Sequence, residues 1–186
     1  MVSVLDLWLP ILLSAVAVFL ASFVLHMVLK YHQSDVKAHP AEEELLAAVR
    51  RTNAPVGDYI LPHATMATMN SPEFVAKRSA GPVALLTVLP GGPPEMKREL
   101  TGWFIYSVVV SIFAAYLTSR ALGHHPNATY LDAFRFAGTT AFLGYGMAQL
   151  QESIWWGRSW TTTLKNLFDA LVYGLLTGGV FGWLWP

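Results

Sequence analysis

The chain has 186 residues, of which 54% are hydrophobic and only 13% are charged, and its mean hydropathy is +0.42. This composition excludes an ordinary water-soluble domain and predicts that a lipid bilayer is the principal partner. The formal net charge is zero, its basic residues are scattered and no cysteine is present, which excludes a nucleic-acid-binding surface, disulfides, thiolate metal sites and iron–sulfur clusters.

Four apolar segments are long enough to cross a bilayer core, which needs roughly 20 helical residues. They run from Leu7 to Leu29, Trp103 to Ser119, Leu131 to Glu152 and Leu164 to Trp185, with Trp and Tyr residues near their ends. We therefore predict an all-α membrane protein with four transmembrane helices. Residues 1–30 form the first, residues 31–100 form a cytoplasmic loop or small cap, and residues 101–186 form the other three.

The first segment has two interpretations, a cleaved signal peptide or a retained anchor. Its N-terminal flank carries Asp6 and no Lys or Arg, and its apolar stretch is longer than the hydrophobic region of a signal peptide. The sequence favours a retained transmembrane helix.

The orientation follows from the Lys and Arg residues near the helix ends, which favour the cytoplasmic side. Six flank one side and Arg120 alone flanks the other; the six are Lys30, Lys37, Lys97, Arg98, Arg158 and Lys165. We expect a multi-pass protein of a bacterial inner membrane with both termini outside, N-out and C-out.

The long loop carries signals of a folded cap. Three acidic residues follow Pro40 and two basic residues end the stretch, which predicts a helix over Ala41–Arg51. Ser71-Pro72-Glu73 predicts the start of a second helix that ends before Gly81. The run Val83–Leu89 is too short to span a membrane and is read as a buried strand or an interfacial segment.

Small residues recur at every fourth position in two of the predicted membrane helices. Such stripes let helix backbones approach closely, either within the bundle or against another membrane protein or a second copy of the chain. The two stripes are Ala170, Gly174, Gly178 and Gly182 in the last helix, and Ser107, Ser111, Ala115 and Ser119 in the second.

Charged residues avoid the middle of the predicted spans. Asp132 and Arg135 are placed to pair near one membrane face, and Lys165 and Asp169 are spaced for an intrahelical pair near the other. Because the last two spans are joined by a short turn, Glu152, Arg158 and Asp169 are expected to gather there. Together with His26 they are a possible polar site, for a lipid headgroup, a partner or an ion.

The six histidines do not indicate a haem or metal site. Only His26 lies within a predicted span, where its spacing from Ser22 suggests a hydrogen-bonded packing residue. His32 and Asp35 could supply two ligands, although capping of the next turn is the favoured interpretation. The sequence thus predicts no metal, no cofactor and no catalytic residue.

Several stretches resemble a family of small bacterial four-helix integral membrane proteins to which no activity is assigned. These stretches are Tyr31–Asp35, Gly81–Val88, Ser153–Trp160, Phe168–Gly174 and Phe181–Pro186. The resemblance implies a membrane topology and a bacterial origin, and it carries no catalytic residue to this chain.

Three functions fit these features. The first is a non-catalytic accessory, assembly or scaffold component of a membrane complex or homo-oligomer, favoured by the many close-packing residues. The second is a small oligomeric transporter or channel with entry sites at the polar helix ends. The third is a membrane enzyme in which Glu152, Asp169 and His26 supply acid–base chemistry.

Overall fold

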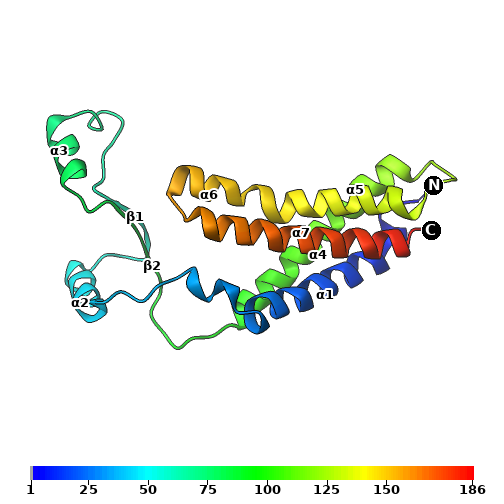
Figure 1. The fold of residues 1–186 in the computed structure, drawn as a ribbon, viewed down its shortest axis with the longest axis horizontal. Helices are drawn as coiled ribbons and strands as arrows, with labels where there is room; N and C mark the ends of the chain where they lie inside the picture. The colour runs from blue at the N-terminus through cyan, green and yellow to red at the C-terminus, as the bar shows by residue number, and fades with distance from the viewer. Residues whose placement is uncertain (1) are drawn as a thin grey trace. The chain divides into compact units, whose positions relative to one another are not determined.

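The computed structural model describes residues 2–186 (Figure 1), which divide into two compact units. One unit combines residues 2–36 with residues 95–186 and is helical. The other unit comprises residues 37–94, so it is shorter at both ends than the loop expected over residues 31–100. The difference at the N-terminal side matters, because residues 31–36 belong to the helical unit.

The helical unit is built from helices that run alongside one another, with both chain termini at the same end (Figure 1). Its elements are α1 (Trp8–Phe23), a π-helical turn (Val24–Val28), α4 (Lys97–Leu122), α5 (Tyr130–Phe142), a second π-helical turn (Leu143–Met147), α6 (Gln149–Trp156) and α7 (Trp160–Trp183). Near one end, the backbone N–H of Val2 donates to the carbonyl of Gly123 at 3.1 Å. This bond holds the start of the chain beside the end of α4.

Two helices formed by residues 2–186 are long and apolar enough to cross a membrane, Leu5–Val28 and Lys97–Leu122. They correspond to the first two predicted spans. The third predicted span is divided into α5, a π-helical turn and α6, so it offers no long uninterrupted α-helix. The fourth corresponds to α7, whose Lys165, Asn166 and Asp169 lower its hydropathy.

The helical unit exposes many large apolar side chains, and its interior mixes small and hydroxyl side chains with a few large ones such as Leu7, Val18 and Phe181. In α1, Leu12 and Leu20 are exposed, whereas Ser14 and Ala15 are fully buried. In α4, Ile112 and Phe113 are exposed, and the whole stripe predicted from the sequence is buried: Ser107, Ser111, Ala115 and Ser119. The small residues of the core allow close backbone packing, and the large buried side chains fill the space between the helices.

The most extensive packing between two elements of the described residues joins α5 to α7, whose backbones lie close together. All four members of the α7 stripe, Ala170, Gly174, Gly178 and Gly182, are buried. A Cβ on Gly174 would lie 2.9 Å from the carbonyl oxygen of Gly138, and one on Gly178 would lie 2.7 Å from that of Phe134. Of the two interpretations of this stripe, the structure supports packing within the chain.

The unit of residues 37–94 contains two helices and a two-stranded antiparallel sheet. These are α2 (Glu42–Thr52), β1 (Gly57–Leu61), α3 (Pro72–Ala80) and β2 (Ala84–Val88), with Gly57 opposite Val88 and Leu61 opposite Ala84. Both predicted helices are confirmed, and the Ser71 hydroxyl accepts a hydrogen bond from the Phe74 N–H as an N-cap.

The sheet differs from the sequence expectation in two respects. The run Val83–Leu89 does contain a strand, but β2 is exposed or half-buried along its length rather than buried. Its partner β1 was not predicted, since its five residues Gly57–Leu61 lack the alternation of apolar and polar residues that marks a half-buried strand.

The backbone contact between α5 and α7 yields a test with a neighbouring control. Gly178→Ala should lower the free energy of unfolding, and Gly178→Leu should lower it by about 1–3 kcal/mol or more, because the added side chain meets the backbone of α5. Gly179→Ala should be neutral or stabilising, since its Cβ would meet only the Tyr130 hydroxyl at 3.8 Å and alanine favours the helix. Thermal unfolding of purified protein in detergent measures both; equal melting temperatures for Gly178→Leu and wild type would contradict the packing.

Candidate functional site

The site lies where the chain leaves α1. A π-helical turn over Val24–Val28 carries His26, and Lys30 then adopts a left-handed conformation with φ of 56° that ends the helix. A 3₁₀ turn over Tyr31–Ser34 follows and brings Tyr31 and His32 against α7. Single π-helical turns inside helices are frequent at functional sites because they redirect the side chains that they carry.

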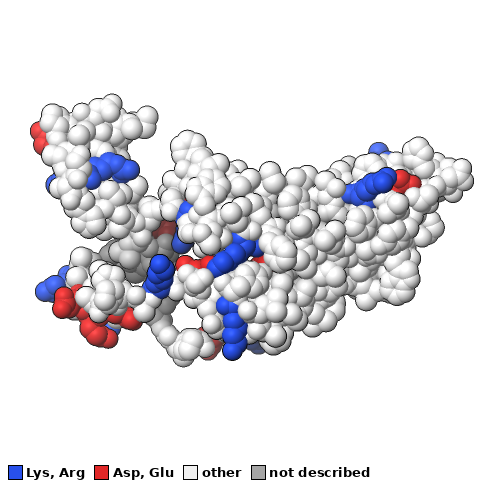
Figure 2. Space-filling model, in the orientation of Figure 1, with Lys and Arg blue, Asp and Glu red and all other residues white. Residues whose placement is uncertain are grey.

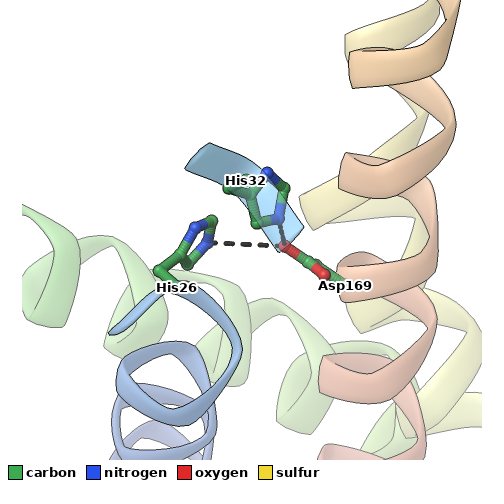
Figure 3. A group of neighbouring side chains, drawn as sticks. All are labelled: His26, His32 and Asp169. Atoms are coloured by element: carbon green, nitrogen blue, oxygen red, sulfur yellow. Dashed lines mark hydrogen bonds and ion pairs between the residues drawn. The ribbon is translucent and has the colours of Figure 1, made fainter. Parts of the chain in front are cut away.

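The carboxylate of Asp169 on α7 is the centre of the site (Figure 3). Asp169 is only 3% exposed, and three side chains from the first 32 residues point at it. Tyr31 donates its hydroxyl proton to Oδ1, while Nε2 of His32 lies 2.9 Å and Nε2 of His26 lies 3.4 Å from Oδ2. The buried charge is therefore compensated entirely by residues distant in sequence.

A second carboxylate, that of Asp35, completes the cluster. Its Oδ2 lies 2.6 Å from Nδ1 of His32, and its Oδ1 accepts a hydrogen bond of 2.6 Å from Nζ of Lys165. The same ammonium group donates to the Tyr31 carbonyl at 2.7 Å and to the Ser34 hydroxyl at 2.9 Å. Lys165 thus fixes the whole turn after α1 to the start of α7.

The electrostatics of the cluster follow from these contacts. Burial favours the neutral carboxyl of Asp35, but the hydrogen bonds from Lys165 and His32 outweigh it and hold the pKa of that carboxyl below its usual range. Burial, together with the Asp169 carboxylate, raises the pKa of the Tyr31 phenol above its usual range. The phenol therefore remains a hydrogen-bond donor throughout the physiological pH range.

His32 bridges the two carboxylates, with one ring nitrogen facing each. An ionised carboxylate only accepts hydrogen bonds, so both contacts are satisfied when both ring nitrogens carry protons. In that state, two negative and two positive groups balance one another. A neutral His32 would instead present a free lone pair to the Asp169 side or to the Asp35 side.

Three side chains in this cluster could together hold a metal ion. One ligand atom from each of His26, His32 and Asp169 lies within 4.8 Å of the other two. The two imidazole rings are stacked, with centroids 4.2 Å apart and an angle of 29° between their planes (Figure 3). Two neutral imidazoles and a carboxylate form a donor set suited to divalent transition metals.

The residues that the sequence places in one polar site lie in two separate groups. Glu152 and Arg158 do form an ion pair, with 3.9 Å between Nε and Oε2, but both are substantially exposed. Within residues 2–186, no hydrogen bond or ion pair joins Asp169 to either of them, and Asp169 instead binds Tyr31 and the histidines. The partners of Asp169 are therefore supplied by the end of α1 and the turn after it, and not by the short turn between the last two helices.

Three pairings inferred from helical spacing are wrong. Lys165 pairs with Asp35 rather than with Asp169. Asp132 forms a capping box with Thr129 at the start of α5 rather than a pair with Arg135. Ser22 donates to the Phe19 carbonyl and accepts from the Trp103 indole rather than bonding to His26. In each case a partner from the adjacent turn or another helix replaces the expected neighbour.

Three aromatic side chains pack against one another next to the site. Tyr173 lies one turn after Asp169 on α7 and packs edge-to-face against Tyr145, with ring centroids 5.3 Å apart. Trp103 on α4 contacts both tyrosine rings. These aromatic side chains close the apolar core immediately beside the buried carboxylate.

The roles of Tyr31 and Lys165 in the site were not predicted. The order Tyr31-His32-Gln33-Ser34-Asp35 directly after an apolar helix was the available signal, since His and Asp three residues apart can pair. Nothing in the spacing along α7 indicates that this turn lies over Asp169, because that contact spans 137 residues of sequence.

Comparisons with known proteins give no match: no family model, no curated protein and no solved structure is similar to this chain.

Two substitutions, each of which removes the charge of one carboxylate, test whether Asp169 and Glu152 belong to separate polar groups of unequal importance for stability. Asp169→Asn should lower the free energy of unfolding by about 1.5–3 kcal/mol, because the buried carboxylate accepts charge-assisted hydrogen bonds. Glu152→Gln should change it by at most about 1 kcal/mol, since its ion pair is exposed and long. Thermal unfolding followed by circular dichroism measures both, and equal effects would show that Asp169 is not the structural centre.

Proposed function

We propose that the chain is a four-helix integral membrane protein that acts as a non-catalytic accessory or scaffold component of a membrane complex or homo-oligomer. In this proposal α1, α4, the α5–α6 segment and α7 all cross the bilayer. The bacterial inner membrane is the proposed location, with both termini outside and the unit of residues 37–94 in the cytoplasm.

The observation that carries the membrane assignment is the distribution of side chains on the helical unit. Large apolar residues are exposed on every long helix, such as Leu20 on α1, Phe113 on α4, Phe136 on α5 and Leu171 on α7. A soluble monomer rarely exposes so much contiguous apolar surface, whereas a lipid-facing surface requires it. On the face in Figure 2, the acidic and basic residues of this unit gather towards its ends, and the surface between them is uncharged.

Two observations agree with the proposed orientation. The hydrogen bond between Val2 and Gly123 holds the N-terminus beside the α4–α5 turn, so both belong to the same membrane face. Lys165 and the turn after α1 belong to the opposite end, where the sequence concentrates its basic residues. That excess favours the cytoplasm.

The scaffold role is supported by what the polar cluster does in this structure. Its carboxylates, ammonium group and imidazoles bind one another and fix the turn over Tyr31–Ser34 to α7. The chain continues from this fixed turn into the separate unit of residues 37–94. We propose that the membrane bundle anchors this unit, and that the unit contacts the partner.

A second candidate, a small oligomeric transporter or channel, is favoured by hydroxyl groups inside the bundle. Within residues 2–186, five buried hydroxyls have no hydrogen-bond partner: those of Ser14, Ser111, Thr118, Tyr173 and Thr177. A buried hydroxyl without a partner costs about 1–3 kcal/mol, so waters or a passing solute would stabilise these groups.

Reporter fusions test the proposed topology. A reporter active only outside the cytoplasm should be active when fused after Pro186 or inserted in the turn of residues 124–127. The same reporter should be inactive when inserted at Gly91-Gly92, because the basic residues keep that segment inside. Activity of a cytoplasm-only reporter after Pro186 would overturn the orientation, and recovery of the protein in the soluble fraction would overturn the membrane assignment.

Thiol labelling separates the two candidate functions, because the chain has no cysteine of its own. For a scaffold with a dry core, a water-soluble thiol reagent added to the purified protein in detergent should leave Ser111→Cys unlabelled and should label Ser159→Cys, which is exposed. Comparable labelling at both positions would favour a water-filled path and hence a transporter or channel.

A further inference from the structure

We propose that His26, His32 and Asp169 form a binding site for one divalent transition metal ion of the zinc class. This inference goes beyond the scaffold role and stands independently of the number of membrane spans, since all three residues belong to one compact unit.

The spacing of the donor atoms matches the coordination shell of a small ion. Zinc binds nitrogen and oxygen at about 2.0–2.1 Å, so two ligand atoms on one ion are about 2.9 Å apart at a right angle and about 3.4 Å apart at the tetrahedral angle. The distances from Asp169 Oδ2 to Nε2 of His32 and of His26 are 2.9 and 3.4 Å. The ligand atoms of the two histidines lie within 4.8 Å of each other, so the imidazoles would adjust around an ion placed beside Oδ2.

The surroundings of His32 are those of a metal-ligating histidine. Such a residue commonly donates its other ring N–H to a carboxylate, which fixes the tautomer and increases the basicity of the ligating nitrogen. Here Nδ1 of His32 lies 2.6 Å from Asp35, and Asp35 is itself held by Lys165 at 2.6 Å. Nε2 is thereby directed at Asp169, where the ion would lie.

Charge and access also favour a cation. When His32 gives up the proton that faces Asp169, as a metal ligand must, the cluster contains two carboxylates against the single ammonium group of Lys165, and its net charge of −1 would be balanced by a cation. The Asp169 and His32 side chains are 5% and 12% exposed, whereas the His26 side chain is 45% exposed. His26 thus forms the open side, through which an ion would enter and where water would complete its coordination.

The donor set selects the class of ion. Two imidazole nitrogens disfavour Mg²⁺ and Ca²⁺, which prefer oxygen ligands, and favour zinc, nickel, cobalt and copper. Because the chain has no cysteine, no thiolate competes with this site or confuses its detection. Zn²⁺ for calorimetry and Co²⁺ for absorption spectroscopy are therefore suitable probes.

The experiment uses the full-length protein in detergent, purified without a histidine tag and treated with a chelator. Titration with Zn²⁺ should give one equivalent bound per chain and a raised melting temperature. His26→Ala should abolish this step, and it is the decisive variant because His26 is half-exposed and its loss does not threaten folding. Asp35→Asn should weaken binding about 10- to 100-fold, as loss of an outer-shell partner does.

The matched control removes the adjacent histidines His124 and His125, which are exposed in the turn between α4 and α5. This double alanine variant should bind Zn²⁺ as the wild type does. The proposal is overturned if wild-type protein binds no stoichiometric Zn²⁺, if His26→Ala binds it unchanged, or if the control variant loses it. Co²⁺ spectra that lack a change between wild type and His26→Ala would contradict it as well.

Discussion

The buried carboxylate of Asp169 is the constraint on which the arrangement of the helical unit depends. A charge removed from water is tolerated only when it is paired and hydrogen-bonded. α7 cannot supply those partners, because Lys165 on the same helix is engaged with Asp35. The partners come from the end of α1 and the turn after it, so burial of one side chain requires the N-terminal segment to dock on α7.

The close packing of α5 against α7 makes this docking possible. Glycines at positions 138, 174 and 178 let the two backbones touch, and Ala170 continues the same buried face up to Asp169. In the proposed membrane location, where apolar side chains gain little by leaving the solvent, such contacts and the polar cluster would supply much of the helix association. The bundle is therefore fixed by backbone contact along most of its length and by hydrogen bonds at one end.

The sequence predicts the local features of this fold well and its long-range pairings poorly. Apolar length located the helices, and the four-residue repeat located the buried face of α7, because both depend on residues close in sequence. Spacing rules failed for Lys165 and Asp169, because each has a stronger partner beyond α7. The strand β1 was missed for a similar reason, since its partners on β2 lie 23 to 31 residues away, from Ala84 opposite Leu61 to Val88 opposite Gly57.

The sequence does not predict the proposed metal site, because His26, His32 and Asp169 have no common spacing motif. His26 and His32 are six residues apart, and a regular helix would place them on different faces. The π-helical turn at Val24–Val28 and the left-handed Lys30 change the direction of the chain between them, so that the two rings stack. Local backbone irregularity, which residue patterns do not encode, creates the donor geometry.

A single position, between His32 Nε2 and Asp169 Oδ2, connects the proposed scaffold role to the proposed metal binding. The 2.9 Å contact there is satisfied by a proton on the imidazole or replaced by a metal ion, and both cannot occupy it together. The Asp35–Lys165 pair holds His32 in either state, because its contacts involve the opposite side of the ring. The turn over Tyr31–Ser34 therefore remains attached to α7 whichever cation is present. Ion binding would change the charge and hydration beside the exposed face of His26, while the anchoring of the chain that leads to residues 37–94 is retained.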